Sequence, residues 1–176
     1  MAKRPEKSEK SEKPEKPEKP EATDVPHVMV IESRFYEEIA DELARGALSE
    51  LDDAGVTYER FAVPGTFEIP AAVRIAIKSR EFNPVRRRFD GYVALGCVIR
   101  GDTSHYDYVC GESARGLQNL ALEYVLAIGY GILTCENRKQ AEERASVSKL
   151  NKGGGAARTC LEMIEFKRYF RLFPRR

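Results

Sequence analysis

The chain has 176 residues, of which 29 are Lys or Arg and 28 are Asp or Glu, so its formal net charge is only +1. That length suits one domain of roughly 150 residues with an appendage. The balanced charge gives no electrostatic reason to expect a nucleic-acid partner, and no apolar run approaches the ~20 residues that span a bilayer.

The appendage is a charged segment over residues 1–24 that repeats Glu-Lys-Pro and Ser-Glu-Lys. No residue between Lys3 and Thr23 is large and apolar, so the segment cannot bury enough surface to offset its ordering entropy. Its seven basic and seven acidic residues argue against a nucleic-acid arm or a polybasic membrane anchor. It also lacks the apolar stretch of a signal peptide. We expect a disordered tail over residues 1–24 and a single folded domain over residues 25–176.

Four cysteines, Cys97, Cys110, Cys135 and Cys160, are widely spaced. They form no CxxC pair, and no histidine stands at a metal-ligand interval from them. Reduced, buried thiols in a cytoplasmic protein explain this pattern most simply. We therefore expect a cytoplasmic location and no metal site.

Short apolar runs alternate with longer helical patterns along the rest of the chain. Apolar spacing predicts a helix over residues 36–54, which Gly55 would end as a C-cap. Asn137 is the expected N-cap of a shorter helix. In chain order the expected elements are a strand at 27–31, a helix at 36–54, a strand at 56–63, a helix at 67–78, a loop at 83–88, a strand within 89–99, a helix at 104–127, a strand at 128–134, a helix at 137–146, a loop at 147–155 and a helix at 156–170.

Strands that alternate with helices in this way are typical of an α/β protein with a parallel sheet and right-handed crossovers. The strands read as short and apolar throughout, as expected where helices cover both faces of the sheet. Four strands make a small sheet, so some apolar helix faces are expected to need a partner. Oligomerisation is therefore a first expectation.

Candidate functional residues gather where the strands end. In an open parallel sheet, ligands bind outside the carboxyl ends of the strands. The turns that leave those ends are residues 32–35, 64–68, 96–105 and 131–136, and the unusual residues of the chain lie mostly in them. That convergence predicts a ligand site at this edge.

The third turn lies in GCVIRGDTSHYDYV, residues 96–109, which is close to a phosphate-binding P-loop. Asp102 stands where that motif needs Lys and would repel a nucleotide's phosphates. A glycine-bearing turn at a helix N-terminus still favours an anion. His105 is then either a surface or capping residue, or a proton carrier beside that anion.

The other candidate side chains also have two readings. Glu68 either complements the dipole at the start of a helix or receives the hydroxyl groups of a polar ligand. Phe35 either packs in the core or stacks on a planar ring. Taken alone, Arg144 and Lys152 are interpreted as solvated surface residues.

Six motifs in one order make the chain resemble the lumazine synthase family over about residues 27–165. They are SRF at 33–35, VPGTFEIP at 63–70, LGCVIRGDTSHYDYV at 95–109, GILT at 131–134, AEERA at 141–145 and NKG at 151–153. The resemblance implies a flavodoxin-like three-layer sandwich with a four-stranded parallel sheet.

The resemblance also implies a reaction of riboflavin biosynthesis. A transferase would condense 5-amino-6-(D-ribitylamino)uracil with 3,4-dihydroxy-2-butanone 4-phosphate. Imine formation, phosphate release and ring closure would give 6,7-dimethyl-8-ribityllumazine. The family uses no metal or organic cofactor, and its sites lie between neighbouring subunits of a homopentamer.

The resemblance implies a role for each candidate residue. His105 would be the general acid/base, Phe35 would stack on the pyrimidine ring, and Glu68 would hold ribityl hydroxyls. Arg144 of an adjacent subunit would complete the phosphate site, and Lys152 would assist. The other implied substrate contacts are Thr66 and Phe67 beside the ring, backbone groups of Cys97, Val98 and Ile99 at the ring edge, Gly101, Asp102 and Thr103 at the phosphate, and Tyr130 from the next subunit.

The chain departs from the usual family pattern at some positions. Tyr36 replaces the usual Asn, and Thr66 replaces a common Ala. Between Arg144 and Lys152 the chain reads SVSKL and lacks the glycine-rich link of members that form sixty-subunit shells. We therefore expect a free pentamer or a dimer of pentamers.

Alternatives to a synthase are a catalytically weak flavin- or lumazine-binding paralogue, a flavodoxin-like FMN protein and a structural assembly protein. Tyr36 motivates the first of these. A protein that only binds has no need of His105, Arg144 and Lys152. An FMN protein leaves the combination of Glu68, His105 and Arg144 without a role. Assembly is compatible with catalysis, so particle size alone does not separate the third alternative.

Overall fold

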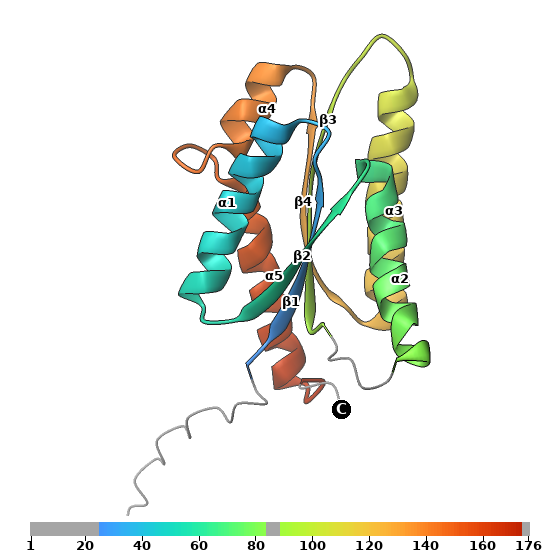
Figure 1. Cartoon of the computed structure of the whole chain (residues 1–176), viewed down its shortest axis with the longest axis vertical. Coiled ribbons are helices and arrows are strands. Elements are labelled where there is room, and N and C mark those ends of the chain that lie inside the picture. Colours follow the sequence, from blue (N-terminus) through green and yellow to red (C-terminus); the bar gives the residue numbers. More distant parts are fainter. Residues whose placement is uncertain (1–24, 84–88, 174–176) are drawn as a thin grey trace, which may run out of the picture.

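The computed structural model describes residues 25–83 and 89–173, which form a three-layer α/β sandwich (Figure 1). The middle layer is a four-stranded parallel sheet in the order β2-β1-β3-β4. The strands are β1 (His27–Ser33), β2 (Thr57–Val63), β3 (Gly91–Ile99) and β4 (Ala127–Cys135). The helices are α1 (Glu37–Asp53), α2 (Ile69–Phe82), α3 (His105–Tyr124), α4 (Arg138–Ala145) and α5 (Lys152–Tyr169), with a short 3-10 helix, η2 (Thr66–Glu68), before α2. The flavodoxin-like architecture expected from the sequence is confirmed.

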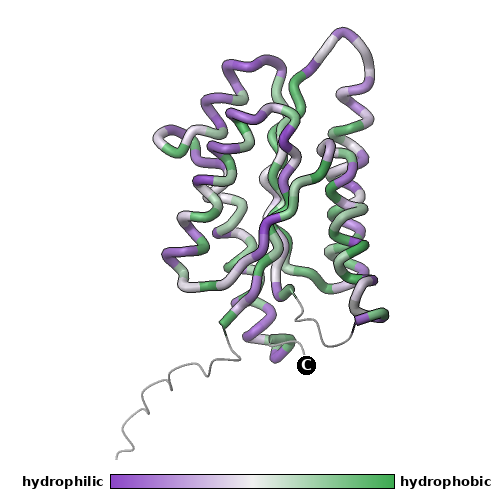
Figure 2. The backbone as a smooth tube through the Cα atoms, in the orientation of Figure 1, coloured by the Kyte–Doolittle hydropathy of each residue, from purple (hydrophilic) through white to green (hydrophobic). Residues whose placement is uncertain are grey.

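Helices cover both faces of the sheet, and each face has its own apolar core. Helices α1, α4 and α5 lie on one side of the sheet, and α2 and α3 lie on the other (Figure 1). On the first side Val30 and Leu95 of the strands pack with Leu43 of α1. On the second side Ile31 of β1 packs with Leu117 of α3. Hydrophilic and hydrophobic residues alternate along the helices (Figure 2), as expected for helices with one buried face.

Strand β2 contradicts the expectation that every strand is apolar and covered on both sides. Its burial alternates, and Thr57, Glu59 and Arg60 are exposed. The reason is its position at the edge of the sheet, where β1 is its one partner among the described strands. Charged side chains are a usual feature of such edges.

Helix α5 begins four residues earlier than the sequence pattern predicts, so the expected loop over residues 147–155 is too long. A Cβ added at Gly153 would lie 2.0 Å from the backbone oxygen of Leu43 in α1. Residues 153–155 are part of α5, and the missing side chain at Gly153 lets the backbones of α1 and α5 approach. Asn151, at a φ of 42°, caps α5 by accepting a hydrogen bond from the N–H of Gly154 at 3.1 Å.

Other boundaries differ from the expectation by a few residues. Strand β1 continues to Ser33, and α3 ends at Tyr124 because Val125 takes the left-handed conformation, with a φ of 52°. The predicted cap at Asn137 is confirmed, since its side chain accepts from Gln140 N at 3.0 Å.

Some expectations concern residues that lie outside the described ranges. The disordered tail over residues 1–24 and most of the loop at 83–88 therefore stay predictions. Within residues 25–83 and 89–173, no helix has both the length and the apolar character needed to cross a membrane.

Candidate active site

Two phenyl rings project from the edge of the sheet where β1 and β2 end. Phe35 follows β1 directly, and its side chain is 72% exposed. Phe67 lies in η2 and is also largely exposed. Their exposure leaves two aromatic faces available to a ligand or to a neighbouring chain.

The turn after β2 places Glu68 beside these rings. Its carboxylate folds back over Gly65, since a Cβ added at Gly65 would lie 2.7 Å from Glu68 Oε2. Glu68 is exposed and therefore open to a ligand's hydroxyl groups, whereas Thr66 is only 5% exposed. The side chain of Thr66 lies under this turn, next to Gly96 of β3.

The turn between β3 and α3 is an open loop at a helix N-terminus. Residues 101–104 are exposed, and no heavy atom lies within 4 Å of a Cβ added at Gly101. Helix α3 begins at His105, and the side chain of Ser104 makes no capping hydrogen bond. The N–H of His105 donates to Thr103 Oγ1 at 3.4 Å, and that of Asp107 donates to the backbone oxygen of Ser104 at 3.0 Å. The helix N-terminus still favours an anion through the positive end of its dipole. The exposed imidazole of His105 stands beside that position.

Arg100, at the end of β3, is engaged by its own neighbours. Its guanidinium bonds Asp107 at 3.1 Å and Glu136 at 2.9 Å and lies over the ring of Tyr106, 4.0 Å from its centroid. The hydrogen bond to Asp107 raises the pKa of the Arg100 guanidinium above its usual value. Arg100 therefore fixes the start of α3 against the turn after β4.

The last residues of β3 can supply backbone hydrogen-bonding groups to a ligand rather than reactive side chains. Cys97 is buried, and this burial raises the pKa of its thiol to about 12. A thiol with that pKa remains protonated at neutral pH and is a poor nucleophile. Val98 and Ile99 are half-buried at the same strand end.

A second set of candidate residues lies around a cavity of about 490 Å³ along the edge of β4. Tyr130 of β4, Arg144 of α4 and Lys152 of α5 all line it. Arg144 donates to the backbone oxygen of Gln140 at 3.2 Å, and within residues 25–83 and 89–173 neither Arg144 nor Lys152 has a carboxylate in ion-pair contact. Two cations without acidic partners make this cavity suitable for an anion.

Burial raises the pKa of the Tyr130 hydroxyl, which keeps the phenol neutral at neutral pH. The ring remains partly exposed at the cavity. It can therefore supply an apolar face and a hydrogen-bond donor to a ligand.

The candidate residues thus form two groups on one chain. The strand-end group contains Phe35, Thr66, Phe67, Glu68, Cys97, Val98, Ile99, Gly101, Asp102, Thr103 and His105. The β4-edge group contains Tyr130, Arg144 and Lys152, whose cavity is lined by β4, α4 and α5 and by no residue of the strand-end group.

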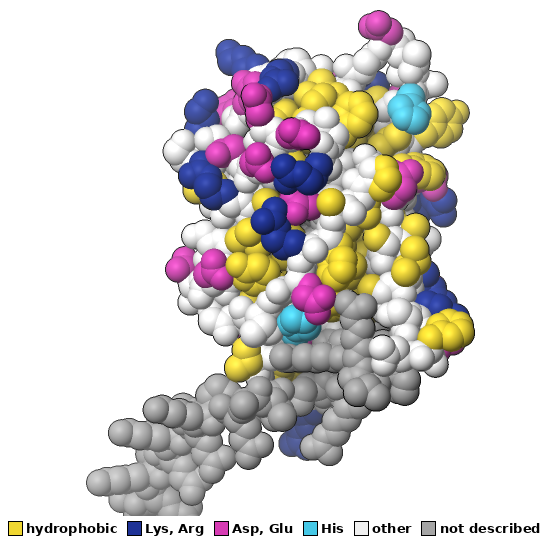
Figure 3. All heavy atoms as spheres, in the orientation of Figure 1, with side chains coloured by type: hydrophobic (Ala, Val, Ile, Leu, Met, Phe, Trp, Pro, Cys, Tyr) yellow, Lys and Arg dark blue, Asp and Glu magenta, His cyan; other side chains and the backbone are white. Residues whose placement is uncertain are grey.

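An apolar groove of about 790 Å³ continues from that cavity along the β4 edge. It runs between α3 and α5, with Leu122, Met163, Phe166 and Phe170 among its lining residues. Tyr130 and Thr159 border both the groove and the cavity. On the face drawn in Figure 3, hydrophobic side chains also reach the surface between groups of charged ones.

Sequence reasoning missed the charged residues that support the turn after β1. Glu32 is buried, and it binds Arg34 and Arg60. The hydrogen bond from Arg34 to Asp41 raises the pKa of the guanidinium. A charged residue at the end of the apolar run HVMVI was the available signal. Arg34 is two residues away, but Arg60 comes from β2, and Asp41, which binds Arg34, comes from α1, so no local pattern indicates the whole set.

Comparisons with known proteins agree with this architecture. Residues 26–168 match the family model described as 6,7-dimethyl-8-ribityllumazine synthase. The chain is 52% identical to the 6,7-dimethyl-8-ribityllumazine synthase of Afipia carboxidovorans over 141 residues, which cover 80% of this chain and 85% of that protein. It is 50% identical to the synthase of Bartonella tribocorum over 145 residues, 82% of this chain and 92% of that one. The chain therefore belongs to the 6,7-dimethyl-8-ribityllumazine synthase family.

Proposed function

We propose that this protein condenses 5-amino-6-(D-ribitylamino)uracil with 3,4-dihydroxy-2-butanone 4-phosphate. The products are 6,7-dimethyl-8-ribityllumazine and phosphate, so the enzyme is a transferase of riboflavin biosynthesis. Family membership over residues 26–168 carries this proposal. An exposed aromatic ring, a free carboxylate and an open helix N-terminus at one sheet edge support it.

The pyrimidine substrate binds at the strand-end group. Phe35 stacks on its ring, with Phe67 and Thr66 alongside. Backbone groups of residues 97–99 bond the ring edge. Glu68 accepts hydrogen bonds from the ribityl hydroxyls, which an ionised carboxylate does with both oxygens.

The phosphate of the second substrate binds at the turn formed by Gly101, Asp102 and Thr103. The N-terminus of α3 supplies N–H groups and the positive end of the helix dipole. The guanidinium of Arg144 from a neighbouring subunit adds a charge-assisted fork, and Lys152 adds a second positive charge.

His105 moves protons during imine formation, phosphate elimination and ring closure. Its position at the first residue of α3, directly after the turn that we propose for the phosphate, supports this role. An imidazole ring can both accept and donate a proton, and a general acid/base of this kind contributes roughly 10²- to 10⁴-fold. Holding the two substrates together supplies another large part of the acceleration.

We infer that a complete site takes residues from two copies of the chain. The cavity around Arg144 and Lys152 supports this inference, because no residue of the strand-end group lines it. A heterologous contact forms a ring where the rotation between copies closes, and we propose the homopentamer that the family resemblance implies. The apolar groove beside the cavity supports this proposal. The exposed Ile75 and Phe82 also support it, since they lie seven residues apart on one face of α2. Light scattering would separate a pentamer or decamer from a sixty-subunit shell, which we do not expect.

The test is turnover. Purified protein is mixed with both substrates, and lumazine absorbance is followed against the uncatalysed reaction. Acceleration that Arg144→Ala weakens supports the enzyme and its phosphate site together. No acceleration, with riboflavin still bound tightly, would favour the catalytically weak binding paralogue. The edge contact between Tyr36 and Phe35 makes Tyr36→Asn the first reversion to try. The cytoplasmic location stays a prediction from the sequence.

A further inference from the structure

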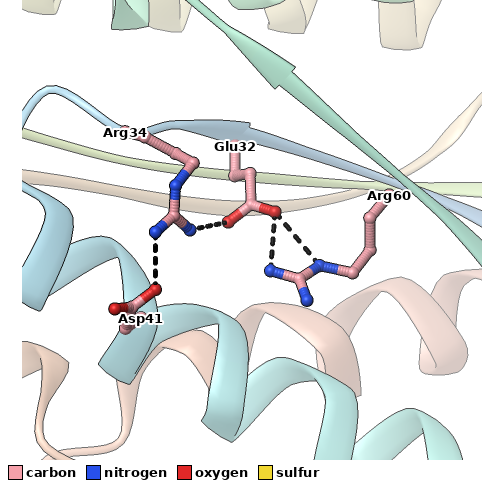
Figure 4. Close-up of polar contacts among 4 residues, drawn as sticks. All are labelled: Glu32, Arg34, Asp41 and Arg60. Atoms are coloured by element: carbon pink, nitrogen blue, oxygen red, sulfur yellow. Dashed lines mark hydrogen bonds and ion pairs between the residues drawn. The ribbon is translucent and has the colours of Figure 1, made fainter.

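A carboxylate is buried at the end of the apolar strand β1. Glu32 is 3% exposed, and both of its oxygens are used (Figure 4). Oε1 accepts from Arg60 Nε at 3.1 Å and from Nη2 at 2.8 Å, and Oε2 accepts from Arg34 Nη1 at 3.2 Å. A buried charge is tolerated only when it is paired and hydrogen-bonded, so this arrangement fixes the guanidinium of Arg34.

Arg34 also binds the first helix. Its Nη2 donates to Asp41 Oδ1 in α1 at 2.7 Å (Figure 4). The same guanidinium therefore bridges the end of β1 and the second turn of α1. Between these two anchors the chain makes the short turn that carries Phe35.

The ring of Phe35 has little support of its own. It is 72% exposed, and its aromatic contact is the edge of Tyr36, with ring centroids 5.0 Å apart and an interplanar angle of 80°. Tyr36 packs against the core on the α1 side. The position of the ring therefore depends on the backbone of the turn rather than on packing around the ring.

We propose that Glu32 is a positioning residue, which acts through Arg34 and Asp41 to hold Phe35 where it stacks on the pyrimidine substrate. This inference rests on the proposed function, because the stacking role of Phe35 belongs to it. Stacking requires a defined offset between two rings. A turn that is already ordered avoids the cost of ordering it when the substrate binds.

The test compares Glu32→Gln and Asp41→Asn with Glu50→Gln as a matched control. Each removes one carboxylate charge, and Glu50 pairs with Arg158 of α5, away from the turn. Glu32→Gln and Asp41→Asn should raise the KM for the pyrimidine substrate about threefold to tenfold, the range expected for an aromatic stack. The KM for the phosphate substrate and kcat should stay within about twofold of the wild-type values. The turn proposed to bind the phosphate, residues 101–103, lies between β3 and α3 and does not depend on Glu32. Glu50→Gln should change none of these values.

A double-mutant cycle separates positioning from a general structural effect. In a Phe35→Ala background, Glu32→Gln should raise the pyrimidine KM no further. An equal rise in both backgrounds, or equal rises in both KM values, would overturn the proposal. If Glu32→Gln fails to fold, Asp41→Asn provides the same test, because Asp41 is largely exposed.

Failure of the proposed function can be distinguished from failure of this inference. Wild-type turnover reports on the function. Fluorescence titration with riboflavin, whose ring system is planar, reports on stacking whether or not turnover occurs. A Kd that rises about threefold or more in Glu32→Gln but not in Glu50→Gln supports positioning. Unchanged riboflavin and pyrimidine binding would refute it.

Discussion

Replacing Arg144 with Ala should weaken binding of the phosphate-bearing substrate far more than binding of the pyrimidine. The guanidinium makes one backbone hydrogen bond, to Gln140, and within the described ranges it has no carboxylate in ion-pair contact. Its charge is therefore available to a phosphate. A hydrogen bond to a charged group contributes about 1.5–3 kcal/mol, so the KM for 3,4-dihydroxy-2-butanone 4-phosphate should rise about 10- to 100-fold.

Steady-state kinetics with each substrate varied in turn provide the measurement. The KM for the pyrimidine should change less than about threefold, since the stacking and ribityl contacts proposed for Phe35 and Glu68 are untouched. Arg144→Lys is the matched control, because it keeps the charge and loses the planar fork, so it should recover part of the loss. Equal increases in both KM values would refute the assignment of Arg144 to the phosphate.

Three further predictions concern catalysis, packing and pH. His105→Ala should lower kcat by roughly 10²- to 10⁴-fold while particle size in light scattering stays the same, and unchanged kcat would remove the proton-transfer role. Gly153→Ala should lower the free energy of unfolding in urea by more than about 1 kcal/mol, because the added Cβ would lie 2.0 Å from Leu43 O. An unchanged free energy of unfolding would contradict the close contact between α1 and α5. Burial raises the pKa of the Cys160 thiol to about 12, whereas the pKa of an unfolded thiol is about 8.5. Between these pH values the unfolded chain loses the thiol proton and the folded chain keeps it. The free energy of unfolding should therefore fall by up to about 1.4 kcal/mol per pH unit in this range. Cys160→Ala should show a shallower fall between pH 9 and 11, and parallel profiles would contradict the proposed burial effect.

Local signals in the sequence were sufficient for most of the fold. The alternation of strands and helices, and the cap at Asn137, depend on residues close together in the chain. Those features were predicted correctly because they reflect backbone hydrogen bonding and apolar periodicity. The start of α5 was misplaced, because the run Gly153-Gly154-Gly155 is typical of a loop, whereas here these residues are helical and Gly153 packs against α1.

The candidate site also has one part that the local sequence predicts and one part that depends on tertiary packing. Phe35, Glu68 and His105 could be found from the sequence because each lies in a turn that leaves a strand, and parallel strands bring their carboxyl ends to one edge. The separate cavity around Arg144 and Lys152 could not be found from the sequence. It depends on how α4 and α5 pack along the edge of β4.

The sequence by itself determined the class of fold, the family and the turns that carry the candidate chemistry, because all of these depend on local composition and order. Only the tertiary structure decided the strand order β2-β1-β3-β4, which makes β2 a charged edge and leaves β4 open to a cavity. It also decided the long-range contacts at the end of β1, where Arg60 of β2 binds Glu32 and Asp41 of α1 binds Arg34. Long-range ion pairs and backbone contacts of this kind arise from packing, and no local pattern in the chain encodes them.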